Sequence, residues 1–250
     1  MAFFVFLNLL SLAAALPTPE PTAMPTMTLE DLKGIPACNN GQHTRIQAAF
    51  NSMQNMAYLA AISDAPDIYQ LLFGPSDTAV VKEQFTTLAS FKLPGNVSIV
   101  CDTAAQTKPC QSEPNLAYSF VPGQTEPHTA VFCSRWFEWQ TSDGCKDPMN
   151  PAELGDDEWP RANDVTLLYA FISTLYPQGL KVGSGPWEGN RYGCYTRKCL
   201  TNLAKAAQDN PQAPNVTTWV AGSYEFYAAG VRARSHQCAG QQAVLTTEVS

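Results

Sequence analysis

Histidine is scarce in this sequence, with only His43, His128 and His236 among 250 residues. Their positions lack the local spacing of a zinc triad, so we expect surface or capping histidines rather than metal ligands. The eight cysteines include no C-x-x-C pair, which disfavours a cysteine-based metal site as well. A G-x-S-x-G nucleophile elbow is also missing, and its absence disfavours a Ser-His-Asp hydrolase. These patterns predict no resident cofactor.

Basic side chains are outnumbered by acidic ones. The sequence has 15 Lys plus Arg against 22 Asp plus Glu, and its formal net charge is −7 at pH 7. A protein that binds nucleic acid needs a basic face. The charge balance therefore argues against a nucleic-acid partner.

Long apolar runs are missing after the first residues of the chain. The run from Ala2 to Ala15 is shorter than the roughly 20 residues that span a membrane, and it ends in small residues. We interpret residues 1–15 as a signal peptide and expect no membrane partner. Residues 16–37 are rich in proline and threonine, so we expect a disordered leader there.

All eight cysteines follow the predicted signal peptide. An even number of cysteines in an exported chain predicts four disulfides. Glycosylation sequons begin at Asn96 and Asn215, which agrees with secretion. We expect a secreted, extracellular monomer with one domain over residues 38–238 and a flexible tail over 239–250.

Hydrophobic periodicity predicts an α+β fold that is mostly helical and has a small β-sheet. Apolar residues at three- and four-residue spacing predict helices over residues 40–60 and 67–73, a helix capped by Asp77, and helices over 164–175, 195–207 and 217–233. Short β-rich runs predict strands at Val97–Cys101, Leu116–Val121 and Ala130–Cys133. The helix over 164–175 has apolar residues around most of its circumference, so we expect it to be central.

Two local patterns suggest other chemistry. The acidic run Asp156–Glu158 could bind a cation, but the spacing of a calcium loop is missing, so we favour a solvated connection. Glu138 lies between Trp136 and Trp139 and could serve glycoside hydrolysis on an aromatic platform. Aromatic residues in such clusters are more often packed in the core.

Six short strings in a fixed order link the region from Cys38 to Cys238 to a known family. They are MAYLAAI at 56–62, CQSEPNLAYSFVP at 110–122, AVFC at 130–133, TLL at 166–168, RYG at 191–193 and SYEFYA at 223–228. In this order the chain resembles the deuterolysin-like secreted zinc metallopeptidases of fungi, which are zincins like the lysine-specific metallo-endopeptidases. The resemblance implies a disulfide-braced, zincin-like catalytic domain.

The resemblance also shows where zinc chemistry would be expected and is missing. Members of the family have His-Glu-x-x-His directly after the TLL-like string, and an aspartate three residues before the tyrosine of a YG pair. This chain has Tyr169, Ala170, Ser173 and Gly189 at those four places, with Tyr192 in the YG pair. Neutral tyrosine and serine are poor zinc ligands, and alanine cannot accept a proton. We therefore expect no metal site and no catalytic residues.

Carrying the family's disulfide pairing over leaves one extra pair in this sequence. The implied bridges are Cys38–Cys101, Cys110–Cys133, Cys145–Cys238 and, from the two cysteines left over, Cys194–Cys199. The former substrate cleft would be lined by Tyr169, Ser173, Trp187, Glu188 and Tyr192. We expect this cleft to bind an unknown peptide, protein or glycan.

Three functional hypotheses remain. The first is a secreted member of the metallo-endopeptidase family that has lost zinc binding and proteolysis and acts by binding in the former cleft. The second is an active metalloendopeptidase with relocated ligands, for example Glu188 and a histidine, which would bind zinc. The third is a structural or antigenic protein associated with the cell wall.

Overall fold

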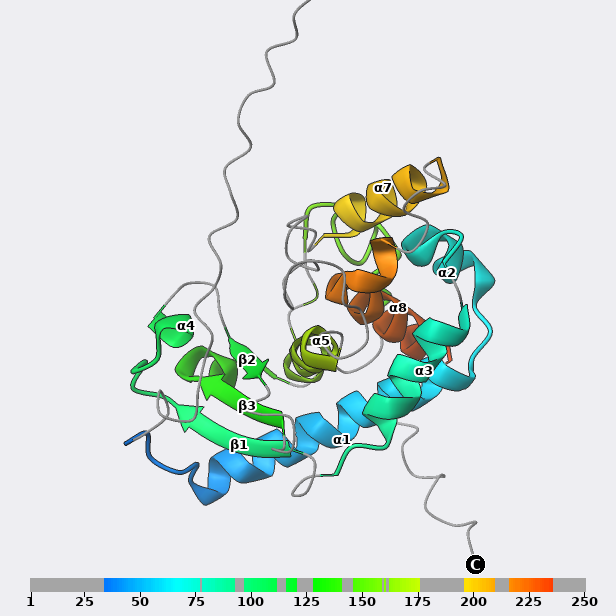
Figure 1. Ribbon diagram of the computed structural model, residues 1–250. Coiled ribbons are helices and arrows are strands. Elements are labelled where there is room, and N and C mark those ends of the chain that lie inside the picture. The colour runs from blue at the N-terminus through cyan, green and yellow to red at the C-terminus, as the bar shows by residue number, and fades with distance from the viewer. Residues whose placement is uncertain are drawn as a thin grey trace, which may run out of the picture.

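A computed structural model of the chain describes residues 34–76, 78–92, 97–111, 116–120, 128–140, 146–158, 160, 162–175, 196–209 and 216–235. The predicted signal peptide, most of the predicted leader and the predicted tail lie outside these residues. The described part is an α+β structure, as the sequence predicts, in which a small sheet lies to one side of most of the helices (Figure 1).

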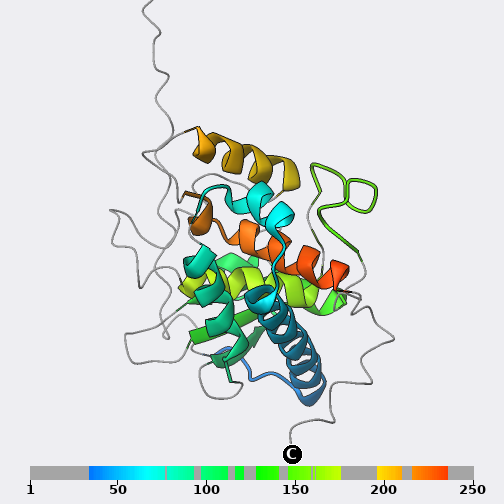
Figure 2. The same cartoon turned by 90° about the vertical axis from the view of Figure 1, so that its right-hand side faces the viewer.

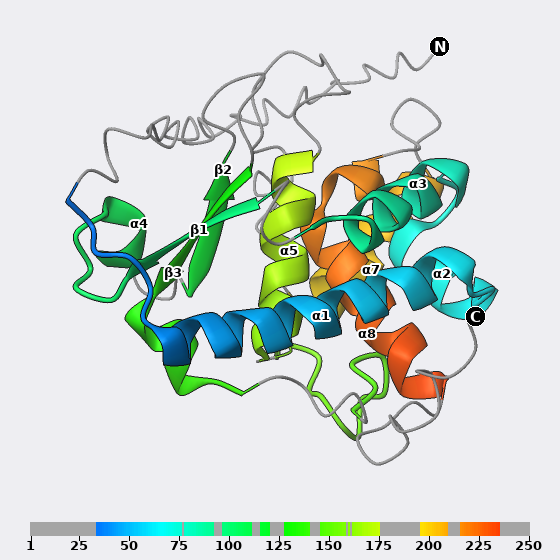
Figure 3. The same cartoon turned by 90° about the horizontal axis from the view of Figure 1, so that it is seen from below.

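The longest described helix, α1 (Asn40–Ile62), runs beneath both the sheet and the other helices (Figure 3). It begins with a capping box, in which Asn39 Oδ1 accepts from the backbone N–H of Gln42 and Gln42 Oε1 accepts from that of Asn39. Its predicted apolar stripe is buried in full: Ile46, Ala49, Phe50, Met53, Met56, Ala57 and Ala60. The helix therefore forms the floor of the core.

The helices α2 (Pro66–Phe73) and α3 (Thr78–Ala89) confirm the next two predicted helices. Proline at the first position fits the start of α2, and Gly74 ends it with a φ of 59°. Aromatic rings from α2 and α3 pack against two buried tyrosines of α8, with ring centroids 5.0 to 5.7 Å apart for the pairs of Phe73 and Phe85 with Tyr224 and Tyr227. Asp77, the predicted cap of α3, lies outside the described residues.

The three described strands form one sheet in the order β1-β3-β2. Strand β1 (Val97–Asp102) pairs in parallel with β3 (His128–Cys133), and β2 (Ala117–Phe120) pairs antiparallel with β3. All three predicted strands are confirmed within one or two residues at their described ends. The antiparallel β2 lies at the edge of the sheet that faces α5 (Figure 1).

Two of the four expected disulfides are present in the described residues. Cys38–Cys101 joins the segment before α1 to β1, and Cys110–Cys133 joins α4 (Lys108–Gln111) to β3. Cys199 is also disulfide-bonded. Cysteines 145, 194 and 238 lie outside the described residues, so the other two pairings stay predictions.

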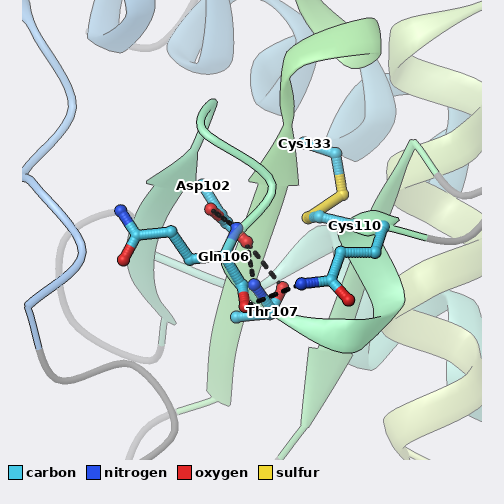
Figure 4. The surroundings of a disulfide bond; sticks show 6 residues. Asp102, Gln106, Thr107, Cys110 and Cys133 are labelled. Atoms are coloured by element: carbon cyan, nitrogen blue, oxygen red, sulfur yellow. Dashed lines mark hydrogen bonds between the residues drawn. A yellow bond between two sulfur atoms is a disulfide. The ribbon is translucent and has the colours of Figure 1, made fainter.

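A buried carboxylate organises the connection between β1 and α4 (Figure 4). Asp102 is fully buried and accepts hydrogen bonds from the backbone N–H of Gln106 (2.7 Å) and from the N–H (2.7 Å) and hydroxyl (2.6 Å) of Thr107. This turn contains Ala105 at a φ of 51°, in the left-handed region that alanine rarely adopts. The carboxylate therefore fixes the turn that brings Cys110 to β3.

The central helix is α5 (Asn163–Leu175), which lies between the sheet and α8 (Ala221–Arg234) (Figures 1 and 3). Its apolar residues Val165, Leu167, Leu168, Phe171 and Ile172 are buried, which confirms its predicted central position. The helix α7 (Arg197–Gln208) lies on the outside against α2 (Figure 2). No described helix is long and apolar enough to cross a membrane.

The predicted single helix over 217–233 is wrong in one respect. A short 3-10 helix, η4 (Val216–Trp219), precedes α8, and Val220 between them has an extended conformation with φ −106° and ψ 108°. The hydroxyl of Thr217 donates to the carbonyl of Phe73 at 2.8 Å, so this β-branched residue is held against α2. Side-chain bonds of this kind compete with regular helix formation.

Candidate functional site

The four positions that the resemblance assigns to zinc chemistry are only partly described. Tyr169, Ala170 and Ser173 lie on α5, and Tyr169 and Ser173 share one face because they are four residues apart. Tyr169 is half-buried and packs against the core, and Ala170 is 5% exposed. Of Ser173 only the backbone is described, and Gly189 lies outside the described residues together with the cleft candidates Trp187, Glu188 and Tyr192.

The side chains at the described positions do not fit a zinc ion. A zinc site needs three or four nitrogen, sulfur or carboxylate donors at bonding distance. Tyr169 offers a phenol packed on the core, and Ala170 offers no donor atom. Among the described residues, no group of three or more His, Cys, Asp and Glu side chains could hold a metal ion.

Strand β2 is the outer strand of the described sheet and lies beside α5. Leu116 accepts from the backbone N–H of Cys133, so Leu116, Tyr118 and Phe120 face β3 with their backbone groups. The N–H and C=O groups of Ala117 and Ser119 therefore point away from the sheet, and no described residue pairs with them. Strand β2 packs against α5, so it borders the helix that carries Tyr169.

The histidines are separated in the described part of the chain. His43 is exposed near the start of α1, His128 begins β3, and His236 lies outside the described residues. Among the described residues, His43 belongs to no group of three or more His, Cys, Asp and Glu side chains that could hold a metal ion. The relocated set of Glu188 and a histidine remains a prediction, since Glu188 is not described.

The aromatic cluster next to Glu138 is core. Trp136 lies on η2 (Ser134–Glu138), is completely buried, and contacts the rings of Phe132 and Phe137 at centroid distances of 4.7 and 5.1 Å. A fully buried ring cannot stack on a sugar. Burial of Trp136 leaves only the partly buried Trp139 of the two tryptophans that the glycoside-hydrolase hypothesis proposed as a platform.

The acidic run in the loop after residue 146 is used for contacts within the protein. Asp156 pairs with Arg197, which is 5% exposed at the start of α7, and Asp157 lies 3.7 Å from Lys198 Nζ. Glu158 accepts from the backbone N–H of Gly155. The favoured interpretation of this run as a connection agrees with these contacts.

The two glycosylation sequons differ in the burial of their third residue, which supplies the hydroxyl. Asn96 and Asn215 both lie outside the described residues. Ser98 is exposed on β1, whereas Thr217 is fully buried and its hydroxyl lies 2.9 Å from that of Ser76. Substitution of Thr217 would therefore disturb the core, so glycosylation there is better tested by Asn215→Gln.

Sequence reasoning missed the polar groups inside the protein. Asp102 is one, and Asp164 is another, because it forms a buried ion pair with Arg232 of α8. The burial of Asp164 could have been inferred from its position, because it is an acidic residue in the first turn of a helix that is predicted to be central. Its partner is 68 residues away, and no local pattern indicates a contact at that separation.

Comparison with known proteins gives no family for this chain, since no family model matches the sequence and no similar curated protein was found.

Proposed function

We propose that this protein is a secreted, zincin-like protein that has lost zinc-peptidase chemistry and binds an extended peptide along the open edge of β2, beside α5. The observation that carries the proposal is the outward direction of the backbone groups of Ala117 and Ser119. An exposed strand edge can pair with an extended peptide, which then adds a strand to the sheet.

The neighbourhood of this edge favours a peptide over a glycan. Main-chain hydrogen bonds give affinity to any extended chain, and pockets for alternate side chains give selectivity. Tyr169 lies on the helix that packs against β2. Trp136, one of the two tryptophans that favoured a sugar, is buried in the core.

The residues on α5 support binding without hydrolysis. A zinc peptidase uses the metal to activate water and a carboxylate to accept its proton. Tyr169 and Ala170 supply neither function. The peptide would therefore remain intact.

The test uses a library of fluorescent octapeptides and measures binding by anisotropy with the native protein and with Ser119→Pro. Proline removes an outward N–H without removing a ladder bond to β3, and edge strands tolerate it. We expect Ser119→Pro to weaken binding of the best octapeptide at least tenfold, which corresponds to about 1.4 kcal/mol. Its free energy of unfolding should change by less than about 1 kcal/mol.

Tyr118→Pro is the contrasting control, because the N–H of Tyr118 faces β3 and its loss should destabilise the sheet. Equal binding by Ser119→Pro would refute the edge as the site. Metal-dependent cleavage of the peptides would instead support the peptidase with relocated ligands. Failure of every octapeptide to bind would favour the structural or antigenic protein.

A further inference from the structure

Three polar side chains from three different helices meet inside the protein. Ser52 comes from α1, Asp164 from α5 and Arg232 from α8. The side chains of Asp164 and Arg232 are 0% and 4% exposed. Ser52 Oγ donates to Asp164 Oδ2 at 2.6 Å, and Arg232 Nη1 donates to that same oxygen at 2.9 Å and to Ser52 Oγ at 2.7 Å.

The charges of this cluster also complement the helix ends at which they lie. Asp164 is in the first turn of α5 and accepts from the backbone N–H of Val165. Arg232 is in the last turn of α8. A negative charge near the start of a helix and a positive charge near its end both interact favourably with the helix dipoles.

A buried charge is strongly unfavourable without its partner, whereas a complete pair tolerates burial. Asp164 and Arg232 therefore restrict how α5 can sit against α8, because any shift that separates them breaks a charged hydrogen bond between two buried side chains. The hydroxyl of Ser52 extends this restriction to α1.

On the face of α5 that the resemblance assigns to zinc, the described positions Tyr169 and Ala170 do not fit a metal ion, since Ala170 has no donor atom and Tyr169 is a half-buried phenol packed against the core. We propose that the cluster of Ser52, Asp164 and Arg232, and not a metal ion on the Tyr169 face, anchors α5 in the core, so that the protein acquires its native structure without divalent metal. This inference does not depend on peptide binding at β2.

The experiment is a double-mutant cycle with Asp164→Leu and Arg232→Met, each variant unfolded in urea in buffer that contains a chelator. Each single variant should raise the unfolding equilibrium constant roughly 100-fold or more, because it removes one partner of a buried ion pair. The double variant should be less destabilised than either single variant, since both charges are gone. Arg234→Met, which breaks the exposed contacts of Arg234 with Asp67 and Asp147, is the matched control and should have a small effect.

Additive effects of the two single variants would overturn the proposal, because they would show that the two charges act independently. If the single variants do not fold, Ser52→Ala provides a milder variant, and it should lower the urea midpoint while the native protein refolds equally well in chelator and in zinc. A native protein that loses its structure in chelator and regains it with zinc would also refute the anchor.

Discussion

Gly74 illustrates how a single backbone conformation limits the sequence. Its φ of 59° and ψ of −128° are unfavourable for any residue with a side chain, and an added Cβ would lie 3.0 Å from the carbonyl oxygen of Ala204. We expect Gly74→Ala to lower the free energy of unfolding by about 2–3 kcal/mol, measured by urea denaturation. Gly41→Ala is the control, because Gly41 lies in the first turn of α1 and an added Cβ would make only an ordinary contact. An equal loss in both variants would contradict this explanation.

Ionisation of the Tyr227 phenol makes the stability of the folded protein depend on pH in the alkaline range. Burial raises the pKa of its phenol, and the carboxylates of Asp64 and Asp67 raise it further. A raised pKa means that the folded state favours the neutral phenol. Stability from this group is present below the unfolded pKa of about 10 and is lost as pH rises through the folded pKa.

We therefore expect the free energy of unfolding to fall as pH rises above about 10, the pKa of tyrosine in the unfolded chain, and to fall less in Tyr227→Phe. Urea unfolding at several pH values measures this difference. Tyr58→Phe is the control because Tyr58 is 55% exposed on α1. The explanation fails if Tyr58→Phe reduces the alkaline fall as much as Tyr227→Phe does.

At the scale of elements, the spacing of apolar residues predicted the described α-helices of eight or more residues, and the composition of the β-rich runs predicted all three described strands. The stripe of α1 and the apolar surface of α5 are local patterns, and burial of those residues follows from them. The missed elements α4 and η2 are short and have no period of their own. They depend on Asp102, on the Cys110–Cys133 disulfide and on Arg45, which donates to the carbonyls of Phe137 and Trp139.

The zinc positions that the resemblance assigns on α5 and at Gly189 can be tested by introducing the missing ligands into the chain. The variant with Tyr169→His, Ala170→Glu, Ser173→His and Gly189→Asp would carry the donors that this chain lacks. We expect the folded variant to bind one zinc ion per chain, measured by calorimetric titration with zinc. A matched variant with only Ala170→Glu and Gly189→Asp lacks the histidines and should bind zinc far more weakly. A folded quadruple variant that takes up no zinc would show that the assignment along α5 is wrong.

At the scale of the whole molecule, contacts between distant segments hold the helices and the sheet together. The pair of Asp164 and Arg232 spans 68 residues, and Arg234 joins α8 to Asp67 of α2 and to Asp147 in the segment between η2 and α5. Sequence patterns could predict that α5 is central, but not which polar groups accompany it into the core. Partner choice at such separations depends on the packing of whole helices, which periodicity does not encode. The position of β2 as the outer strand could not be predicted from the sequence either, because the order of strands in a sheet depends on the whole fold.

The zinc content of the intact, folded protein tests the central claim most directly. The protein is incubated with zinc, dialysed exhaustively and analysed by elemental mass spectrometry against protein concentration. The variant with all four introduced ligands is the positive control. Because Tyr169 and Ala170 supply no suitable donors, we predict close to zero zinc per chain for the native sequence. Nearly one zinc ion per chain would contradict the account and direct attention to relocated ligands, beginning with Glu188 and the three histidines.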